Sequence, residues 1–315
     1  MSSEVDSDLR ALLAQGELDL PDPGQGHTPD RLLALFDLAR SHPVSLARLA
    51  EAHTDAVAIL REAGRKPRSD SLYGVWASAG ADDVHIRVST RGAQRLRGVK
   101  PFASGLGIVD RALVTVIDDA TGDRLLFDVD LDRRTLRTNT DQWVCGALRE
   151  SSTGAVEFVD HEVGQADLVG SPGWYLTRVG FWHGACAPAA CWAGAVAGLL
   201  DAAEELVDDD PHRRAHLGAL RATTWSLRAV LATAGRQIDR APHDVEHARS
   251  RAYAVRHTVE RMATDMLDRF GRAFGPRPFT SSAAVSQRWA DAHLYLRQHH
   301  GERDLAELGR MPWTT

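Results

Sequence analysis

The stretch "RLRGVKPFASGLG" contains residue types that could bind a ligand at a chain reversal. Phe102 and Ser104 follow Lys100, and two glycines come directly after them. Glycines let the backbone turn sharply and come close to another group. A short hydroxyl beside an aromatic ring suits a partner that is flat or charged. We expect this corner to contact such a partner.

A second stretch, "RVGFWHGACAPAACW", combines a cation with aromatic rings where a loop leads into a helix. Arg178, Trp182 and His183 lie there, close to the free N–H groups and positive dipole end of the expected helix. Such an end suits an anion or a polar ligand group. The alternative is structural, with the aromatic pair fastening the helix entrance to the β domain. The sequence leaves both readings open.

A third stretch, "HLYLRQHHGERDLAELG", brings His299, His300 and Glu302 within four positions. Adjacent residues of a helix point about 100° apart, so only one of the two histidines can face a given partner. Gly301 predicts a break in the helix directly after them. The alternative is a helix end at which histidine and arginine complement the dipole.

The sequence "HDVEH", from His243 to His247, matches the inverted zinc-peptidase pattern, in which two histidines share one helix face. No downstream carboxylate stands out as a third ligand. The competing interpretation is a polar first helical turn after Pro242, where acidic residues favour the dipole. We favour that interpretation and expect no metal.

Composition narrows the class of protein. The 315 residues are 43% hydrophobic and carry a net charge of −6, with arginines scattered among carboxylates, so nucleic-acid binding is not expected. Three cysteines and no signal peptide favour the cytoplasm. The apolar run 180–200 has the length of a membrane span, but it continues into "DAAEELVDDD" without a basic flank. We expect a buried bundle helix there and no membrane span.

The order of elements predicts an α+β fold in three parts. Residues 1–70 form a helical part, with helical spacing on both sides of Pro43 and the second helix over about 45–62. Residues 71–169 show short alternating runs typical of an antiparallel β domain. Residues 170–315 form the last part, in which four helical segments predict an antiparallel bundle. We place these segments at about 181–207, 213–240, 244–272 and 283–300.

These parts, in this order, resemble the acyl-CoA dehydrogenase-like flavoproteins, with a shortened N-terminal helical part. "GVKPFASG" is similar to the family's β-domain corner, which implies that Phe102 and Ser104 lie against the isoalloxazine ring of FAD. "YGVWASAGADDVHI" occupies the place of an earlier flavin- and substrate-contacting loop, which makes Trp76 and Ser78 candidates. "RRAHLG" resembles a motif whose arginine meets the FAD pyrophosphate across a subunit boundary, which implies that role for Arg214 and a homodimer or homotetramer.

The resemblance also implies a catalytic base near the C-terminus. The family's usual glutamate falls on His299 by ungapped count, and on Glu302 if the alignment shifts by a few residues. His183 is the third candidate. The same comparison assigns Arg178, Trp182 and His300 to the substrate pocket, facing the candidate bases.

The implied reaction is α,β-dehydrogenation of an acyl thioester, with an electron-transfer partner that reoxidises FAD. Related monooxygenases on the same fold also place histidine in the C-terminal region. Oxygen-dependent oxidation of a small molecule, fed by a separate flavin reductase, is therefore the alternative reaction. A non-catalytic partner subunit is a third reading, because a fold does not guarantee chemistry.

Overall fold

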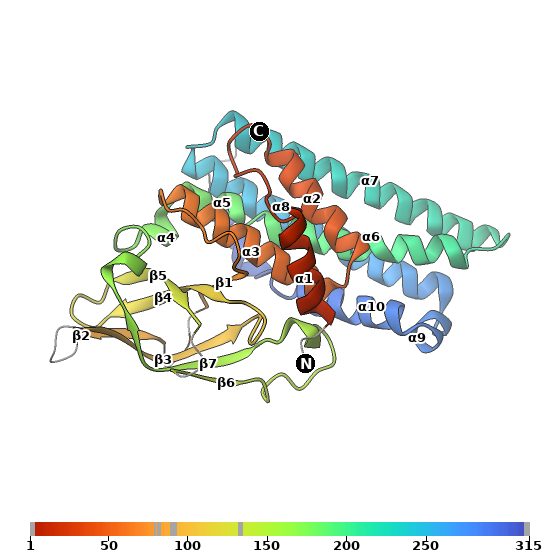
Figure 1. Cartoon of the computed structure of the whole chain (residues 1–315). Helices are drawn as coiled ribbons and strands as arrows, with labels where there is room; N and C mark the ends of the chain where they lie inside the picture. The colour runs from red at the N-terminus through yellow and green to blue at the C-terminus, as the bar shows by residue number, and fades with distance from the viewer. Residues whose placement is uncertain (1–3, 79, 81–82, 89–92, 132–134, 312–315) are drawn as a thin grey trace. The chain divides into compact units, whose positions relative to one another are not determined.

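Helices begin and end the chain, and strands fill its middle. The computed structural model describes residues 4–78, 80, 83–88, 93–131 and 135–311 (Figure 1). Its helices are α1 Glu4–Gln15, α2 Thr28–Ser41, α3 Val44–Glu62, α4 Trp174–Thr177, α5 Val179–Gly184, α6 Ala187–Leu206, α7 Pro211–Arg240, α8 Val245–Phe274, α9 Arg277–Ser281, α10 Ala283–Leu296 and α11 Glu302–Arg310. Its strands are β1 Tyr73–Trp76, β2 His85–Val88, β3 Gln94–Ala103, β4 Arg111–Asp118, β5 Arg124–Asp130, β6 Leu136–Asn139 and β7 Gly154–Val163.

The chain divides into two units. Unit 1 consists of Met1–Asp19, Ala52–Cys145 and Arg149–Phe181, and unit 2 consists of Leu20–Glu51, Gly146–Leu148 and Trp182–Thr315. The boundary between the units falls within α3. The division at residues 70 and 170 therefore stays a prediction about the chain's organisation.

The sheet of unit 1 is mixed. Among the described residues it contains seven strands, in the order β1-β4-β2-β3-β7-β6, with β5 pairing with β4. β1 and β2 each pair with β4 in parallel, whereas β3, β7 and β6 follow one another in antiparallel pairs. Four strand pairs among the described residues are antiparallel, as predicted for this domain, whereas the two parallel pairs were not predicted, because they join segments that are distant in sequence and leave no local signal.

The second half of α3 covers part of this sheet and closes the core of unit 1. Ala56, Ile59 and Leu60 share one helix face and pack against Tyr73, Leu113, Leu126 and Val169. These seven residues are buried, so the apolar spacing of α3 and the inner face of the sheet fit each other.

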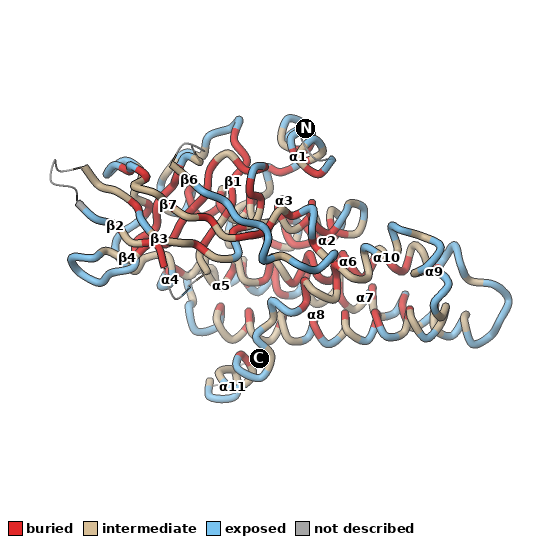
Figure 2. The backbone as a smooth tube through the Cα atoms, turned by 90° about the horizontal axis from the view of Figure 1, so that it is seen from below, coloured by how far each residue is buried: buried red, intermediate tan, exposed pale blue. Residues whose placement is uncertain are grey.

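Unit 2 is a helical bundle built from α6, α7, α8 and α10, with α2 packed on α6 and α7. Buried positions recur at intervals of three or four along the two longest helices, as in Leu220, Thr224 and Leu227 of α7 (Figure 2). Acidic or hydroxyl caps start three of the helices, since Asp210, Asp244 and Ser282 each accept a backbone N–H of the first turn. The predicted four-helix bundle is confirmed.

Small residues let α2 and α6 approach closely. A Cβ atom on Gly194 of α6 would lie 2.1 Å from the carbonyl oxygen of Phe36 on α2, a distance that no side chain tolerates. The alanine- and glycine-rich run is thus a contact surface for a neighbouring helix. Among the described residues, one stretch, Val179–Leu206, is long and apolar enough to cross a membrane, and 72% of its apolar window is buried inside the protein.

Several predicted element ends were wrong. The first bundle segment is broken between α5 and α6, where Pro188 starts the second helix, and the last ends at Leu296 before α11 begins. Helix α1 and strands β1 and β6 were not predicted, since each is short and weakly patterned. The far ends of two predicted strands, at 89–90 and at 132, lie outside the described residues.

Candidate functional site

The predicted corner of unit 1 contains a strained bulge near the end of β3, with an exposed Phe102. The pairing of β3 with β7 is interrupted between Lys100 and Ala103, and Phe102 has a φ of 55°. A non-glycine residue in this left-handed region costs about 1–3 kcal/mol. The Phe102 ring is nevertheless 68% exposed. Strain combined with an exposed aromatic ring is typical of a position that serves a ligand.

Hydrogen bonds hold the other predicted corner residues in place. The indole Nε1 of Trp76 donates to the carbonyl oxygen of Ser104 at 3.0 Å, and the Ser78 hydroxyl donates to the carbonyl oxygen of Pro101. The hydroxyl of Thr153 donates to Oγ of Ser104 at 2.9 Å. Because Ser104 accepts in that bond, its own hydroxyl hydrogen can still be donated to a ligand.

A buried ion pair, between Lys100 and Asp83, lies next to the corner in β3. Sequence reasoning missed this pair. The ammonium of Lys100 pairs with the carboxylate of Asp83 and lies 3.3 Å from Oγ1 of Thr115. Burial lowers the pKa of Lys100, against the opposing effect of Asp83. The available signal was compositional, because lysine occurs only at positions 66 and 100. A lysine within a strand of an arginine-rich chain is unusual, and it could have indicated a buried partner for its charge.

In unit 2 the two adjacent histidines differ in exposure, although both lie in the connection between α10 and α11 and the helical spacing argument does not apply to them. Gly301, with a φ of 57°, lies in the connection between α10 and α11, directly before α11 begins. The side chain of His299 is 4% exposed, whereas that of His300 is 56% exposed. His299 is thus the buried member of the pair.

His299 lies in an aromatic cluster that leaves its ring nitrogens without hydrogen bonds. Its ring centroid is 6.3 Å from that of Trp192 and 5.8 Å from that of His257. Among the described residues neither its Nδ1 nor its Nε2 has a hydrogen-bond partner, and the same is true of the buried Nε1 of Trp192. Unpaired buried polar atoms are costly, so this cluster is suited to receive a polar ligand.

The electrostatics of this cluster favour a neutral imidazole. Burial lowers the pKa of His299, the charge of Arg256 lowers it further, and the Asp304 carboxylate 3.8 Å away opposes both effects. The guanidinium of Arg256 lies 4.7 Å from the ring centre of Trp192 and donates to the carbonyl oxygens of Ala185 and Gln298. Trp192, Arg256 and His257 are residues that sequence reasoning missed, because they lie on α6 and α8 within ordinary helical spacing.

Glu302 and His300 occupy exposed positions. Glu302 is the exposed first residue of α11, and its carboxylate has no hydrogen bond or ion pair among the described residues. Asp304, which is buried, lies 3.4 Å from Nδ1 of His300 and 3.9 Å from Nε of Arg303. The structure therefore brings His299 and Asp304 together in a buried setting and leaves Glu302 outside it.

His183 and Trp182 contact other residues of the bundle. Nε2 of the buried His183 lies 3.0 Å from the carbonyl oxygen of Pro242, and Trp182 makes an edge contact with Tyr253. Arg249 lies over the Trp182 ring at 5.4 Å. No contact between these two residues and His299 is among those of the described residues, so their predicted common pocket stays a prediction.

Arg178 belongs to unit 1 and already has an anionic partner. Its guanidinium lies 2.5 Å from the Glu62 carboxylate and stacks over the rings of Trp174 and Tyr175, with centroids 5.6 and 5.4 Å away. The structural interpretation of this aromatic stretch is favoured for Arg178, because its charge is neutralised within the chain.

Arg214 lies near the start of α7, on the surface of unit 2. It pairs with the Asp209 carboxylate and donates to the carbonyl oxygen of Asp208 at 3.2 Å. Exposed pairs of this kind are worth little, so Arg214 remains able to exchange this partner for a phosphate.

The "HDVEH" motif caps a helix. The Asp244 carboxylate accepts the backbone N–H of His247 at 3.0 Å and contacts its Nδ1 at 2.6 Å, directly before α8 begins. Within the described part of the chain, no group of three or more histidine, cysteine or acidic side chains is arranged to hold a metal ion.

Comparisons with known proteins place this geometry in a wider setting. No family model matches the chain, and no curated protein matches it. Solved structures do match. The FMN-bound form of TdsC, a dibenzothiophene monooxygenase from Paenibacillus sp. A11-2, superposes with a TM-score of 0.80 at 18% identity, covering 98% of this chain and 96% of that one.

Two further solved structures match over nearly their whole length. Methanesulfinate monooxygenase MsuC from Pseudomonas fluorescens gives a TM-score of 0.76 at 15% identity, covering 100% and 99% of the two chains. Butyryl-CoA dehydrogenase from Megasphaera elsdenii gives 0.73 at 14% identity, covering 98% of each. The chain has the acyl-CoA dehydrogenase fold. The fold predicted from the order of elements is confirmed, and the low identity makes this a divergent example of it.

The residues of each unit fit the flavin that proteins of the acyl-CoA dehydrogenase fold bind. In unit 1, the exposed Phe102 ring and the hydroxyl hydrogen of Ser104 offer a flat face and a donor. In unit 2, the unpaired nitrogens of His299 and Trp192 offer a donor and an acceptor in a dry setting. Each set of groups, taken by itself, suits a planar ring with polar edges.

Proposed function

We propose that this protein is a flavin-dependent oxidoreductase that acts on a small molecule, and that its reaction is oxygen-dependent monooxygenation. The support from relatives is that TdsC and MsuC, which share the fold, are monooxygenases by name. The indole complex of TdsC, which superposes with a TM-score of 0.79, indicates the size of molecule that such a protein accepts.

One observation carries the choice of reaction. By ungapped count the position of the glutamate base of a dehydrogenase falls on His299, which is buried and has a lowered pKa, while Glu302, the candidate if the alignment shifts, is exposed. Dehydrogenation of a thioester needs a carboxylate or comparable base in contact with the α-carbon. A neutral buried imidazole is better suited to donate a hydrogen bond, or to exchange one proton, beside a reacting oxygen.

When bound and reduced, the flavin supplies two electrons to dioxygen, so that one oxygen atom enters the substrate and the other leaves as water. The chain's own residues would orient and shield the reactants. Phe102 would lie against the ring, Ser104 would donate to its polar edge, and Nε2 of His299 would hold or release a proton. The aromatic cluster around Trp192 would keep bulk water away.

The identity of the flavin is part of this proposal. FAD is the cofactor that the family resemblance implies, and FMN is the cofactor bound in the TdsC structure. Arg214 distinguishes the two, because only FAD has a pyrophosphate for it to bind. Arg214→Gln should weaken FAD binding several-fold and leave FMN binding unchanged if FAD is native. Equal effects on both flavins would contradict that role.

Dehydrogenation of an acyl thioester is the second candidate, and a specific observation favours it. Asp304 is a buried carboxylate 3.8 Å from His299, so the pair could take up a proton that a lone imidazole could not. The match to butyryl-CoA dehydrogenase agrees with this reading. An electron-transfer partner would then replace the flavin reductase that monooxygenation requires.

Two measurements on the purified protein test the proposal. Titration with FMN and FAD, followed by visible absorbance, should show binding, and a protein that binds neither is the non-catalytic partner subunit instead. Anaerobic addition of acyl thioesters should leave bound oxidised flavin unchanged. Bleaching by any thioester would replace monooxygenation with dehydrogenation.

Two separate measurements test the oligomeric state and the location. Size-exclusion chromatography at micromolar concentration tests the proposed homodimer or homotetramer, and fractionation of cells tests the proposed cytoplasmic location.

A further inference from the structure

A cavity in unit 1 lies apart from the corner and has a different chemistry. It measures about 440 Å³, which is within the usual range for small-ligand sites. Helix α1 and the residues after it form one side, and α3 with the connection to β1 forms the other. We call it the basic pocket; its lining residues are Leu13, Gly16, Leu18, Asp19, His53, Val57, Arg61, Arg65, Lys66, Pro67, Arg68 and Ser69.

The basic pocket concentrates positive charge in an acidic protein. Its lining holds four permanent cations and one carboxylate, whereas the whole chain has a net charge of −6. That carboxylate, Asp19, is paired with Arg61 at 2.7 Å. Arg65 donates to the carbonyl oxygen of Leu168. Among the described residues Lys66 and Arg68 have no carboxylate partner within ion-pair distance, so their charges are available to a ligand.

The floor of the basic pocket contributes a donor whose direction is fixed. Nδ1 of His53 accepts the backbone N–H of Tyr73 at 3.1 Å, which places the imidazole proton on Nε2. His53 is only 4% exposed and lines the pocket, and no hydrogen bond among the described residues engages its Nε2. A donor in the pocket lining, beside cations without carboxylate partners, suits an acceptor from outside the chain.

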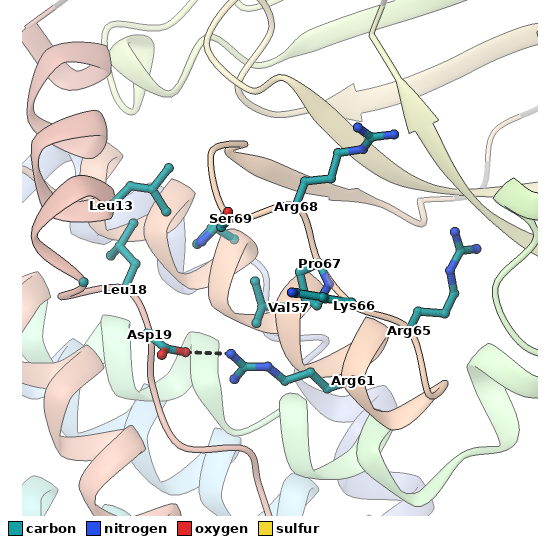
Figure 3. Close-up of a pocket in the computed structure, with 12 residues that line it drawn as sticks. Leu13, Leu18, Asp19, Val57, Arg61, Arg65, Lys66, Pro67, Arg68 and Ser69 are labelled. Atoms are coloured by element: carbon teal, nitrogen blue, oxygen red, sulfur yellow. Dashed lines mark hydrogen bonds and ion pairs between the residues drawn. The ribbon is translucent and has the colours of Figure 1, made fainter.

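The remaining lining is apolar. Figure 3 shows Leu13 and Leu18 on one side and Val57 beside Pro67 and Lys66, with Arg61 reaching across to Asp19. Arg65 and Arg68 extend outward from the same segment in this view. A ligand that fills the space would therefore have a short hydrocarbon body and an anionic group that meets Lys66 and His53.

The basic pocket is distinct from the flavin-facing corner. His53 contacts Tyr73, the first residue of β1, whereas Trp76, the last residue of that strand, contacts Ser104. Opposite ends of a four-residue strand are about 10 Å apart. Occupancy of one site therefore leaves the other open.

We propose that the basic pocket binds a small organic oxyanion, a phosphate monoester or a carboxylate with a short apolar chain, at a second ligand site separate from the flavin. Lys66 supplies the main charge, Nε2–H of His53 donates to an anionic oxygen, and Arg68 adds charge at the mouth. Charge-assisted hydrogen bonds of this kind are roughly twice as strong as neutral ones. The site stands whether or not the protein binds flavin.

Calorimetric titration of the whole protein tests this proposal, with n-butyl phosphate, butyrate, inorganic phosphate and n-butanol as probes. Butyl phosphate or butyrate should bind, and the tighter of the two identifies the anionic group. Inorganic phosphate should bind at least several-fold more weakly, because it has no apolar body. Butanol should not bind. Equal binding of butanol, or no binding of either organic anion, would overturn the proposal.

Variants separate the basic pocket from general surface charge. Lys66→Gln should weaken binding about tenfold, as expected for one lost charge-assisted bond. His53→Asn keeps an acceptor for the Tyr73 N–H and replaces the Nε2–H donor by an amide on a shorter side chain, so binding should weaken by a smaller factor. Arg137→Gln, an exposed change in the same unit, is the matched control and should have no effect. Equal affinity in Lys66→Gln and the Arg137→Gln control would contradict the proposal, as would loss of binding when the protein is saturated with FMN.

Discussion

The corner of unit 1 and the histidine cluster of unit 2 use buried polar groups in opposite ways. At the corner, Lys100 has Asp83, Ser78 has Pro101, and Trp76 has Ser104. In the cluster, the ring nitrogens of His299 and the Nε1 of Trp192 have no hydrogen-bond partner among the described residues. At the corner the chain itself supplies partners for these polar groups. In the cluster the described residues supply none for the ring nitrogens named.

This difference indicates that the corner positions other groups, whereas the cluster can receive a ligand. A buried charge with its partner fixes geometry, and the strain at Phe102 can persist because its surroundings are fully bonded. A buried donor or acceptor without a partner costs about 1–3 kcal/mol, which a ligand can recover on binding. The cluster is therefore where we expect chemistry, and the corner is where we expect positioning.

The largest effect should come from His299. His299→Gln removes the imidazole from the cluster, and turnover should fall by the factor of about 10²–10⁴ that is typical of a positioned acid or base. Flavin affinity should stay within a few-fold, and stability should not fall, because no hydrogen bond is lost. Single-turnover kinetics and thermal unfolding measure the two quantities.

Two neighbours control for His299. Glu302→Gln and His300→Gln change exposed side chains of the same turn and should turn over at the parent rate. If Glu302→Gln loses as much activity as His299→Gln, the buried-cluster account is wrong. If all three keep full activity, His183 becomes the leading candidate.

Breaking the buried pair of the corner should cost the most stability. Lys100→Met leaves the buried Asp83 carboxylate with the Val84 N–H and the more distant Arg124, 3.7 Å away, and should lower the free energy of unfolding by about 3–5 kcal/mol. Urea unfolding followed by tryptophan fluorescence measures this. Arg137→Gln, which removes an exposed pair with Glu157, should cost less than about 1 kcal/mol. A similar loss in both variants would show that the corner is no more rigid than the surface.

His53 is intermediate between the corner and the cluster, because one of its ring nitrogens, Nδ1, has a hydrogen-bond partner. Burial lowers its pKa from 6.5 to about 4, against a small opposing effect of Asp110. Below pH 6.5 the unfolded chain takes up a proton that the folded chain refuses, so stability falls as the pH drops towards about 4. The difference in unfolding free energy between the parent and His53→Asn should change by about 3 kcal/mol over this range. A pH-independent difference would contradict the lowered pKa.

The smallest effect should come from the strained ring of the corner. Phe102→Gly relieves a positive φ, so stability should hold or rise by up to about 1 kcal/mol. Flavin affinity should nevertheless fall about tenfold, because the exposed ring is lost. Unchanged affinity would mean that Phe102 does not face the flavin.

The sequence was informative where the physics is local. Glycines around Phe102 and Ser104 marked the corner, and Gly301 marked the break before α11. It was uninformative where distant segments meet. The partner of Arg178 is Glu62, 116 positions away, and nothing near Arg178 predicts it. His53 and Trp192 lie within regular helical spacing, which also fits plain core residues, so only their contacts reveal them.

The central claim is that this fold carries oxygen chemistry, and one measurement tests it most directly. The protein would be supplied with reduced FMN, isotopically heavy dioxygen and indole as a probe substrate, and the products analysed by mass spectrometry. Our account predicts one heavy oxygen atom in the product, formed by the parent and strongly diminished in His299→Gln. Unlabelled indole in every sample, together with thioester-driven bleaching of the bound flavin, would contradict it.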